Sequence, residues 1–190
     1  MLKAFFRTGA SVGPTLLRVT LGAILLMHGI GKVVQVSFLP GYGFEGTVGF
    51  MNGMLGVPLL LAYAGTLAES VAGVFLLLGL GTRLAGLIAA IQMTAAAVLG
   101  GHVAQGFFVN WMGATVDAGG KAMAAHEGFE FHLALVAMAV SLVVLGGGRL
   151  SLDRVIARAE VPSDAPALTT RKVPGHGGLQ TALSWTMRHL

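Results

Sequence analysis

The chain has 190 residues, of which 55% are hydrophobic and 11% are charged, and its net charge is +4. A soluble domain carries about 25% charged residues, so this composition indicates a membrane protein of one domain. The basic residues are not clustered into a recognition element, and we expect no nucleic-acid partner. Because there is no cysteine, the chain cannot itself supply a disulfide, a cysteine-ligated metal or an iron–sulfur cluster.

The first apolar segment, residues 14–34, has the length of one membrane-spanning helix. No small-residue cleavage site stands out and more apolar segments follow, so we expect a retained signal anchor. Arg18, His28 and Lys32 interrupt the segment, and at about 100° per residue they fall on one side of the helix. A charge in hydrocarbon is costly, which predicts that this side faces protein or water.

Residues 35–57 are broken by glycine and proline, and a helical repeat of apolar residues within them predicts a short interfacial helix. A second span is expected at residues 58–80. It carries a narrow stripe of polar and small residues at helical spacing: Thr66, Glu69, Ser70 and Gly73. Small residues allow close helix packing, so we expect the stripe to face a neighbouring helix.

A third span is expected at residues 84–103, with Gln92 in its interior and His102 at its far end. The turn before it is minimal, so it should run antiparallel to the second span. A fourth span, residues 127–146, has Glu130 near its start and ends at three consecutive glycines. The expected fold is therefore all-α: a four-transmembrane-helix bundle in a lipid bilayer, with the short interfacial helix between spans one and two.

The chain after the fourth span changes character. The expected membrane domain, residues 1–160, closes with a short surface helix capped by Ser151. Residues 161–190 form a polar, Pro-, Gly- and Ser-rich tail that could hold a partner subunit. Of the 12 Lys and Arg residues, all but Lys32 and Lys121 fall on the side of the chain ends. The positive-inside rule then predicts cytoplasmic termini. The membrane that we expect is a bacterial or archaeal inner membrane.

Ionisable residues of separate spans come to similar depths. At about 1.5 Å per residue, His28, Glu69 and Glu130 lie roughly 20–24 Å from the cytoplasmic ends of their helices. This predicts a polar pocket open to the outer face, because intramembrane ionisable residues often mark substrate or proton paths. The alternative is structural: a buried glutamate can pair with a basic residue to fix helix register. No HExxH or CxxCH motif is present, so no metal site is expected.

Several stretches together carry a family resemblance. They span roughly residues 14–155 and read RVTLGAILLMHGIGKV, GVPLLLAYAGTLAESVAGVFLLLGLGTRLAG, GFEFHLALVAMAV and GGGRLSLDRV, with Gly106-Phe107-Phe108 between them. The chain resembles the DoxX family of small four-helix membrane proteins, which includes the DoxD-like subunit of thiosulfate:quinone oxidoreductase. The resemblance implies a quinone-linked or redox-associated membrane role, often within a complex.

The resemblance implies roles for the residues of the expected pocket. The expected acid–base groups are His28, Glu69 and Glu130. The residues expected to bind substrate or quinone are Arg18, Lys32, Gln92 and His102. Quinone would be a substrate, no bound cofactor is expected, and electrons would come from the substrate or a partner's redox centre. The alternative role is a non-catalytic subunit that anchors a larger complex; a small transporter is disfavoured because no internal repeat is visible.

Overall fold

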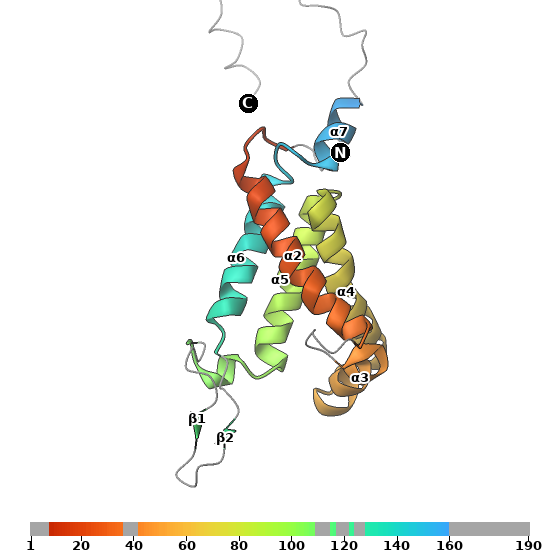
Figure 1. Ribbon diagram of the computed structural model, residues 1–190, viewed down its shortest axis with the longest axis vertical. Helices are drawn as coiled ribbons and strands as arrows, with labels where there is room; N and C mark the ends of the chain where they lie inside the picture. Colours follow the sequence, from red (N-terminus) through yellow and green to blue (C-terminus); the bar gives the residue numbers. More distant parts are fainter. Residues whose placement is uncertain (1–7, 36–41, 109–114, 117–121, 124–127, 160–190) are drawn as a thin grey trace, which may run out of the picture. The chain divides into compact units, whose positions relative to one another are not determined.

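The structure is a computed structural model that describes residues 8–35, 42–108, 115–116, 122–123 and 128–159. Its α-helices are α2 (Gly13–Val33), α3 (Gly43–Gly49), α4 (Leu59–Leu78), α5 (Thr82–Leu99), α6 (Glu130–Leu145) and α7 (Leu152–Ala159) (Figure 1). A π-helical turn, Phe50–Met54, follows α3, and a 3-10 turn, Val103–Gln105, follows α5. Two short strands, β1 (Thr115–Val116) and β2 (Ala122–Met123), pair antiparallel; the sequence had not suggested them.

Three helices, α2, α4 and α5, are long and apolar enough to cross a membrane. The expected fourth span corresponds to α6, which has 16 residues. At 1.5 Å per residue that is about 24 Å, short of a hydrocarbon core of about 30 Å. The count of four spans is therefore not confirmed. Residues 124–127, which include the expected start of that span, and the tail, 161–190, lie outside the described residues.

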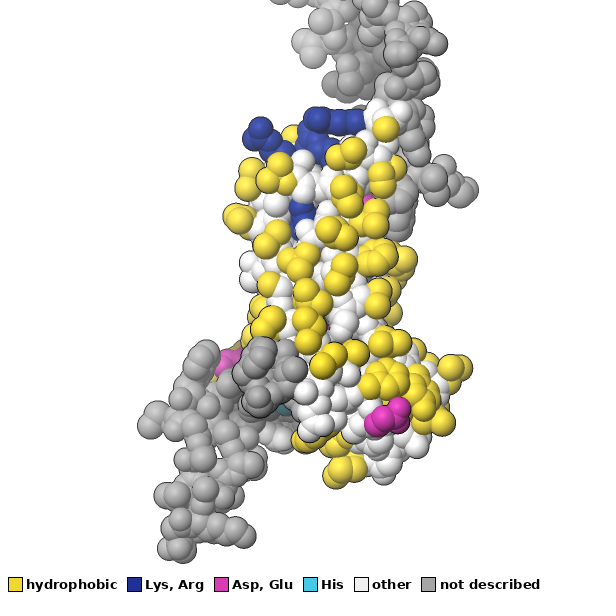
Figure 2. Space-filling model, turned by 45° about the vertical axis from the view of Figure 1, so that its right-hand side comes forward, with side chains coloured by type: hydrophobic (Ala, Val, Ile, Leu, Met, Phe, Trp, Pro, Cys, Tyr) yellow, Lys and Arg dark blue, Asp and Glu magenta, His cyan; other side chains and the backbone are white. Residues whose placement is uncertain are grey.

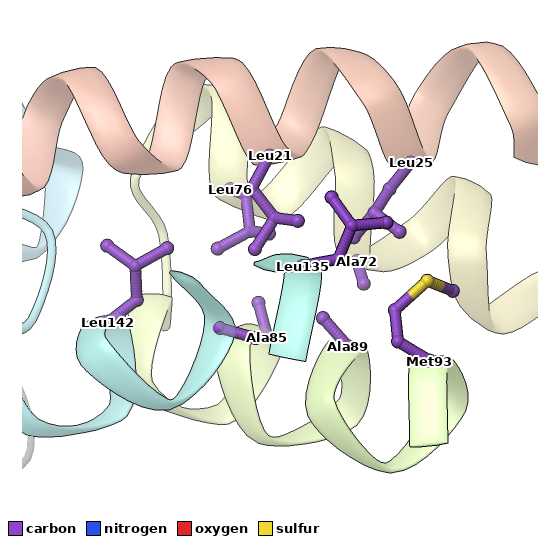
Figure 3. Close-up of a cluster of buried hydrophobic side chains, with 10 residues drawn as sticks. Leu21, Leu25, Ala72, Leu76, Ala85, Ala89, Met93, Leu135 and Leu142 are labelled. Carbon is purple, nitrogen blue, oxygen red and sulfur yellow. The ribbon is translucent and has the colours of Figure 1, made fainter. Parts of the chain in front are cut away.

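The four long helices pack in a ring: α2 contacts α4, α4 contacts α5, α5 contacts α6, and α6 contacts α2 (Figure 1). Their inward side chains form one apolar core (Figure 3). Its larger members are Leu21, Leu25, Leu76, Met93, Leu135 and Leu142. Within each helix the buried positions recur at three- or four-residue steps, so each contributes a single apolar face to the core.

Glycines bring α2 and α4 close together. A Cβ atom on Gly73 would lie 2.7 Å from the backbone nitrogen of Leu26, and one on Gly22 would lie 3.0 Å from the carbonyl oxygen of Gly73. A Cβ on Gly29 would lie 2.5 Å from the backbone nitrogen of Ser70. These distances leave no room for a side chain, so the prediction that the small-residue stripe of α4 faces a neighbouring helix is confirmed.

The short helix expected between the first two spans is present as α3, and it packs against α2 and α4. The Thr47 hydroxyl donates a hydrogen bond to the carbonyl oxygen of Lys32 at 3.2 Å, which ties α3 to the end of α2. Gly56 has a φ of +67°, the left-handed conformation that glycine adopts readily, and lets the chain turn before Pro58 starts the approach to α4.

Arg18 joins three elements at the end of the bundle where α2 begins. The side chain is 3% exposed, and its Nε donates to the carbonyl oxygen of Gly147 at 2.9 Å. Its Nη1 donates to the carbonyl oxygen of Leu76 at 2.9 Å, and its Nη2 donates to that of Leu150. These carbonyls lie in the last turn of α4 and just after α6, where oxygens lack helical partners and a cation is favourable.

Asp153 makes the complementary connection at the same end. Its carboxylate, on a residue 2% exposed, accepts hydrogen bonds from the backbone nitrogens of Gly81 at 2.6 Å and Thr82 at 2.9 Å, where α5 begins. An acid at a helix N-terminus satisfies otherwise unpaired N–H groups. The backbone nitrogen of Arg154 donates to Ser151 Oγ at 3.3 Å, which confirms the expected cap of α7.

Candidate functional site

A cavity of about 270 Å³ lies among α2, α4, α5 and α6, away from the end that Arg18 and Asp153 connect. Its polar lining is His28 and Lys32 from α2, Glu69 from α4, His102 from the segment after α5, and His132 from α6. The rest of the lining is apolar and includes Leu25, Met93 and Phe131. Five ionisable side chains from four parts of the chain therefore line one cavity.

An ion pair joins α2 to α4 across the cavity wall. Lys32 Nζ lies 2.5 Å from Glu69 Oε2. The Glu69 side chain is 4% exposed and the Lys32 side chain is 31% exposed, so the pair is buried on the acid side and reaches solvent on the base side. A buried carboxylate without a partner would be strongly unfavourable. The close approach of the glycine-rich faces lets Lys32 reach Glu69, which is the kind of pair that the structural alternative describes.

Two histidine rings in the lining of the cavity lie against each other. The ring centroids of His102 and His132 lie 4.3 Å apart, with an angle of 38° between the planes. His102 was expected at the site, whereas His132 was not. The sequence shows that Leu135, Ala139 and Leu142 follow His132 at steps of three and four, but only their burial in the structure marks this side of α6 as the inner one. His132 therefore extends the core-facing side of α6.

Three of the expected site residues do not line the cavity. Arg18 is bound to carbonyl groups at the far end of α2. Gln92 Nε2 donates to the carbonyl oxygen of Gly65 at 2.7 Å, which links α5 to α4. Glu130 begins α6 about 140° around the helix from buried Leu135 and is absent from the lining. The residues expected at the site and found together are His28, Lys32, Glu69 and His102.

The chemistry available in the cavity is proton exchange and hydrogen bonding. Imidazole groups can donate or accept protons near neutral pH, and the lysine ammonium donates only. Within the described ranges, no group of three or more His, Asp or Glu side chains is arranged to hold a metal ion. The combination of apolar walls with a few converging polar groups is typical of a small-molecule site.

Part of the chain is similar to known proteins. Residues 13–102 match the DoxX family model. The Bacillus subtilis (strain 168) protein named "Putative oxidoreductase CatD" is 34% identical over 87 residues, which are 46% of this chain and 58% of that relative. The match therefore spans little more than half of the relative's length. No solved structure matches the chain. The matched residues contain α2 to α5; α6, with His132, follows them.

Proposed function

We propose that this chain is a DoxX-family membrane protein that serves as the membrane subunit of a quinone-linked oxidoreductase, with its quinone site in the cavity among α2, α4, α5 and α6. One observation carries the proposal: the Lys32–Glu69 ion pair and three histidines converge on one hollow with apolar walls. A relative named as an oxidoreductase supports the redox part of the proposal. Intramembrane ionisable residues with no role in chemistry would not need to gather in this way.

The size and walls of the cavity suit the ring of a quinone. Its volume of about 270 Å³ lies just below the range of roughly 300–1,000 Å³ for small-molecule pockets, so it holds a single ring rather than a ring with its tail. Phe131 lines the cavity and is 44% exposed, which gives an apolar tail a route to the surface. Leu25 and Met93 supply the apolar contacts on the opposite walls.

The polar residues match what quinone reduction requires. Each quinone takes up two electrons and two protons and becomes a quinol. Lys32 donates a hydrogen bond to one ring oxygen, to which His28 delivers the first proton, and the facing histidines, His102 and His132, deliver the second proton to the other oxygen. The electrons come from a reduced sulfur compound or from the redox centre of a partner, because the chain has no cysteine. Two thiosulfate ions would supply the pair of electrons by joining as tetrathionate.

The second candidate function is a non-catalytic anchor for a larger membrane complex. The observation that favours it is the use of charge for packing elsewhere in the same bundle. Within the part of the chain that the structure describes, the hydrogen bonds of the buried Arg18 and Asp153 side chains go to backbone groups where helices begin or end. By that reasoning, the Lys32–Glu69 pair would fix the register of α2 against α4, and the cavity would hold lipid or water.

Quinone binding and turnover distinguish the two functions. The full chain, in nanodiscs, is titrated with a short-tailed quinone analogue, and turnover with thiosulfate is then measured in the copurified complex. His132→Ala removes a cavity side chain without touching the ion pair, and His176→Ala in the tail is the matched control. Losing a hydrogen bond costs about 0.5–1.5 kcal/mol, so His132→Ala should weaken binding by about two- to tenfold. Equal affinity in wild type, His132→Ala and Glu69→Gln would rule out the quinone site and favour the anchor.

A further inference from the structure

A second cavity, of about 340 Å³, lies at the end of the bundle where α4 ends and α7 begins. Three arginines line it: Arg149, Arg154 and Arg158. Arg154 and Arg158 are one turn apart on α7, so they share a face. Figure 2 shows Lys and Arg side chains gathered at the upper end of the described helices, above a surface of mainly hydrophobic side chains. This cavity is separate from the one that holds His28, Lys32 and Glu69.

The positive charge of this cavity is not neutralised by the described part of the chain. No carboxylate of the described residues pairs with Arg149, Arg154 or Arg158. The acid on α7, Asp153, is buried and occupied by the backbone nitrogens of Gly81 and Thr82. Arg154 Nη1 donates a hydrogen bond to the carbonyl oxygen of Gly9 at 3.1 Å. This bond orients the guanidinium group but does not neutralise its positive charge. Unneutralised guanidinium groups bind phosphate well, because their donors match its oxygens.

The same cavity has an exposed apolar side. Leu150 is 71% exposed, Val155 is 62% exposed and Leu78, in the last turn of α4, is 49% exposed. On α7, Val155 lies about 60–100° around the helix from the two arginines, so an apolar face adjoins the basic one and the helix is amphipathic. A free phosphate ion would make no use of these apolar groups. A molecule with both a phosphate and an acyl chain would use both sides.

We propose that Arg149, Arg154 and Arg158 bind the phosphate of an anionic phospholipid whose acyl chain lies against Leu78 and Val155. The cavity adjoins the last turn of α4, a helix long and apolar enough to cross the membrane, which puts it at the level of the headgroups. A basic amphipathic helix at that level binds anionic lipid through charge and buried apolar area together. The site holds α7, and with it the Asp153 connection to α5, against the membrane.

Native mass spectrometry of the full chain in detergent tests this site with defined lipids. Phosphatidylglycerol is added to wild type and to the Arg154→Gln/Arg158→Gln variant, and the bound fraction is followed against lipid concentration. Each arginine near an anionic surface contributes about a fivefold gain in affinity, so the variant should bind roughly 25-fold more weakly. Arg171→Gln/Lys172→Gln, in the tail, removes the same charge and should bind as wild type does. Arg154→Lys/Arg158→Lys keeps both positive charges and should retain most of the affinity. That result would show that changing these two residues does not by itself disrupt the fold.

Two further measurements, with phosphatidylcholine and with inorganic phosphate, identify the ligand. Phosphatidylcholine, which has a phosphate but no net charge, should bind at least tenfold more weakly than phosphatidylglycerol to wild type. Inorganic phosphate at equal concentration should not displace the lipid. The proposal is overturned if the tail variant loses as much affinity as the α7 variant, because charge alone would then explain binding. Displacement of the lipid by inorganic phosphate, or equal binding of the two lipids, would also overturn it.

Discussion

Replacing Lys32 with methionine removes the partner of Glu69 while keeping an unbranched side chain of similar length. The carboxylate of Glu69, 2.5 Å from Lys32 Nζ and on a side chain only 4% exposed, would be left without its cation. Removing one partner of a buried pair costs about 3–5 kcal/mol. Lys32 is 31% exposed, and solvent screening lowers the value of a partly exposed pair, so we expect a loss of about 2–4 kcal/mol in the free energy of unfolding.

A double-mutant cycle isolates the pair. Glu69→Gln removes the charge that needs compensation, so the Lys32→Met/Glu69→Gln protein should be more stable than Lys32→Met alone. The measurement is unfolding in mixed micelles, followed by circular dichroism at 222 nm. Glu45→Gln, an exposed carboxyl on α3, is the matched control and should change stability by less than about 0.5 kcal/mol. Additive effects of the two single changes, or an unaltered Lys32→Met protein, would refute the reasoning.

Two further changes test the contacts between helices. Asp153→Asn leaves one oxygen to accept from Gly81 and Thr82 where two accept now, so it should cost about 1–3 kcal/mol and speed amide exchange at those two residues. Gly73→Ala places a Cβ 2.7 Å from the Leu26 backbone nitrogen and should cost about 1–3 kcal/mol by forcing α2 and α4 apart, measured by the same unfolding assay.

A control variant or a contradicting outcome can be named for each of these two changes. An added Cβ on Gly49 in α3 would meet no atom within 4 Å, so Gly49→Ala should be neutral or slightly stabilising. If Gly73→Ala and Gly49→Ala behaved alike, the close contact of α2 with α4 would be wrong. Amide exchange at Gly81 and Thr82 that did not change in Asp153→Asn would remove Asp153 from the start of α5.

The inner face could be predicted from the sequence for α4 but not for α6. On α4, Glu69 and Gly73 share the face that packs on α2, as the stripe predicted. On α6 the same reasoning was misleading, because Glu130 lies off the core-facing side and the core residues are Leu135, Ala139 and Leu142. A polar stripe marks the inner face only where the helix has another apolar face for lipid. In α6 nearly every side is apolar, so periodicity alone could not orient it.

The sequence by itself determined that the chain is a helical membrane protein, roughly where its apolar helices lie, and that basic and acidic groups must avoid lipid. These follow from local composition, since hydrophobic length and glycine placement act within one segment. Only the tertiary structure decided which partner each charge has. In the structure Glu69 pairs with Lys32 rather than with Arg18, and the ring of His132 lies against that of His102. The rotation of each helix about its axis decides these partners, and that rotation is set by packing against its neighbours.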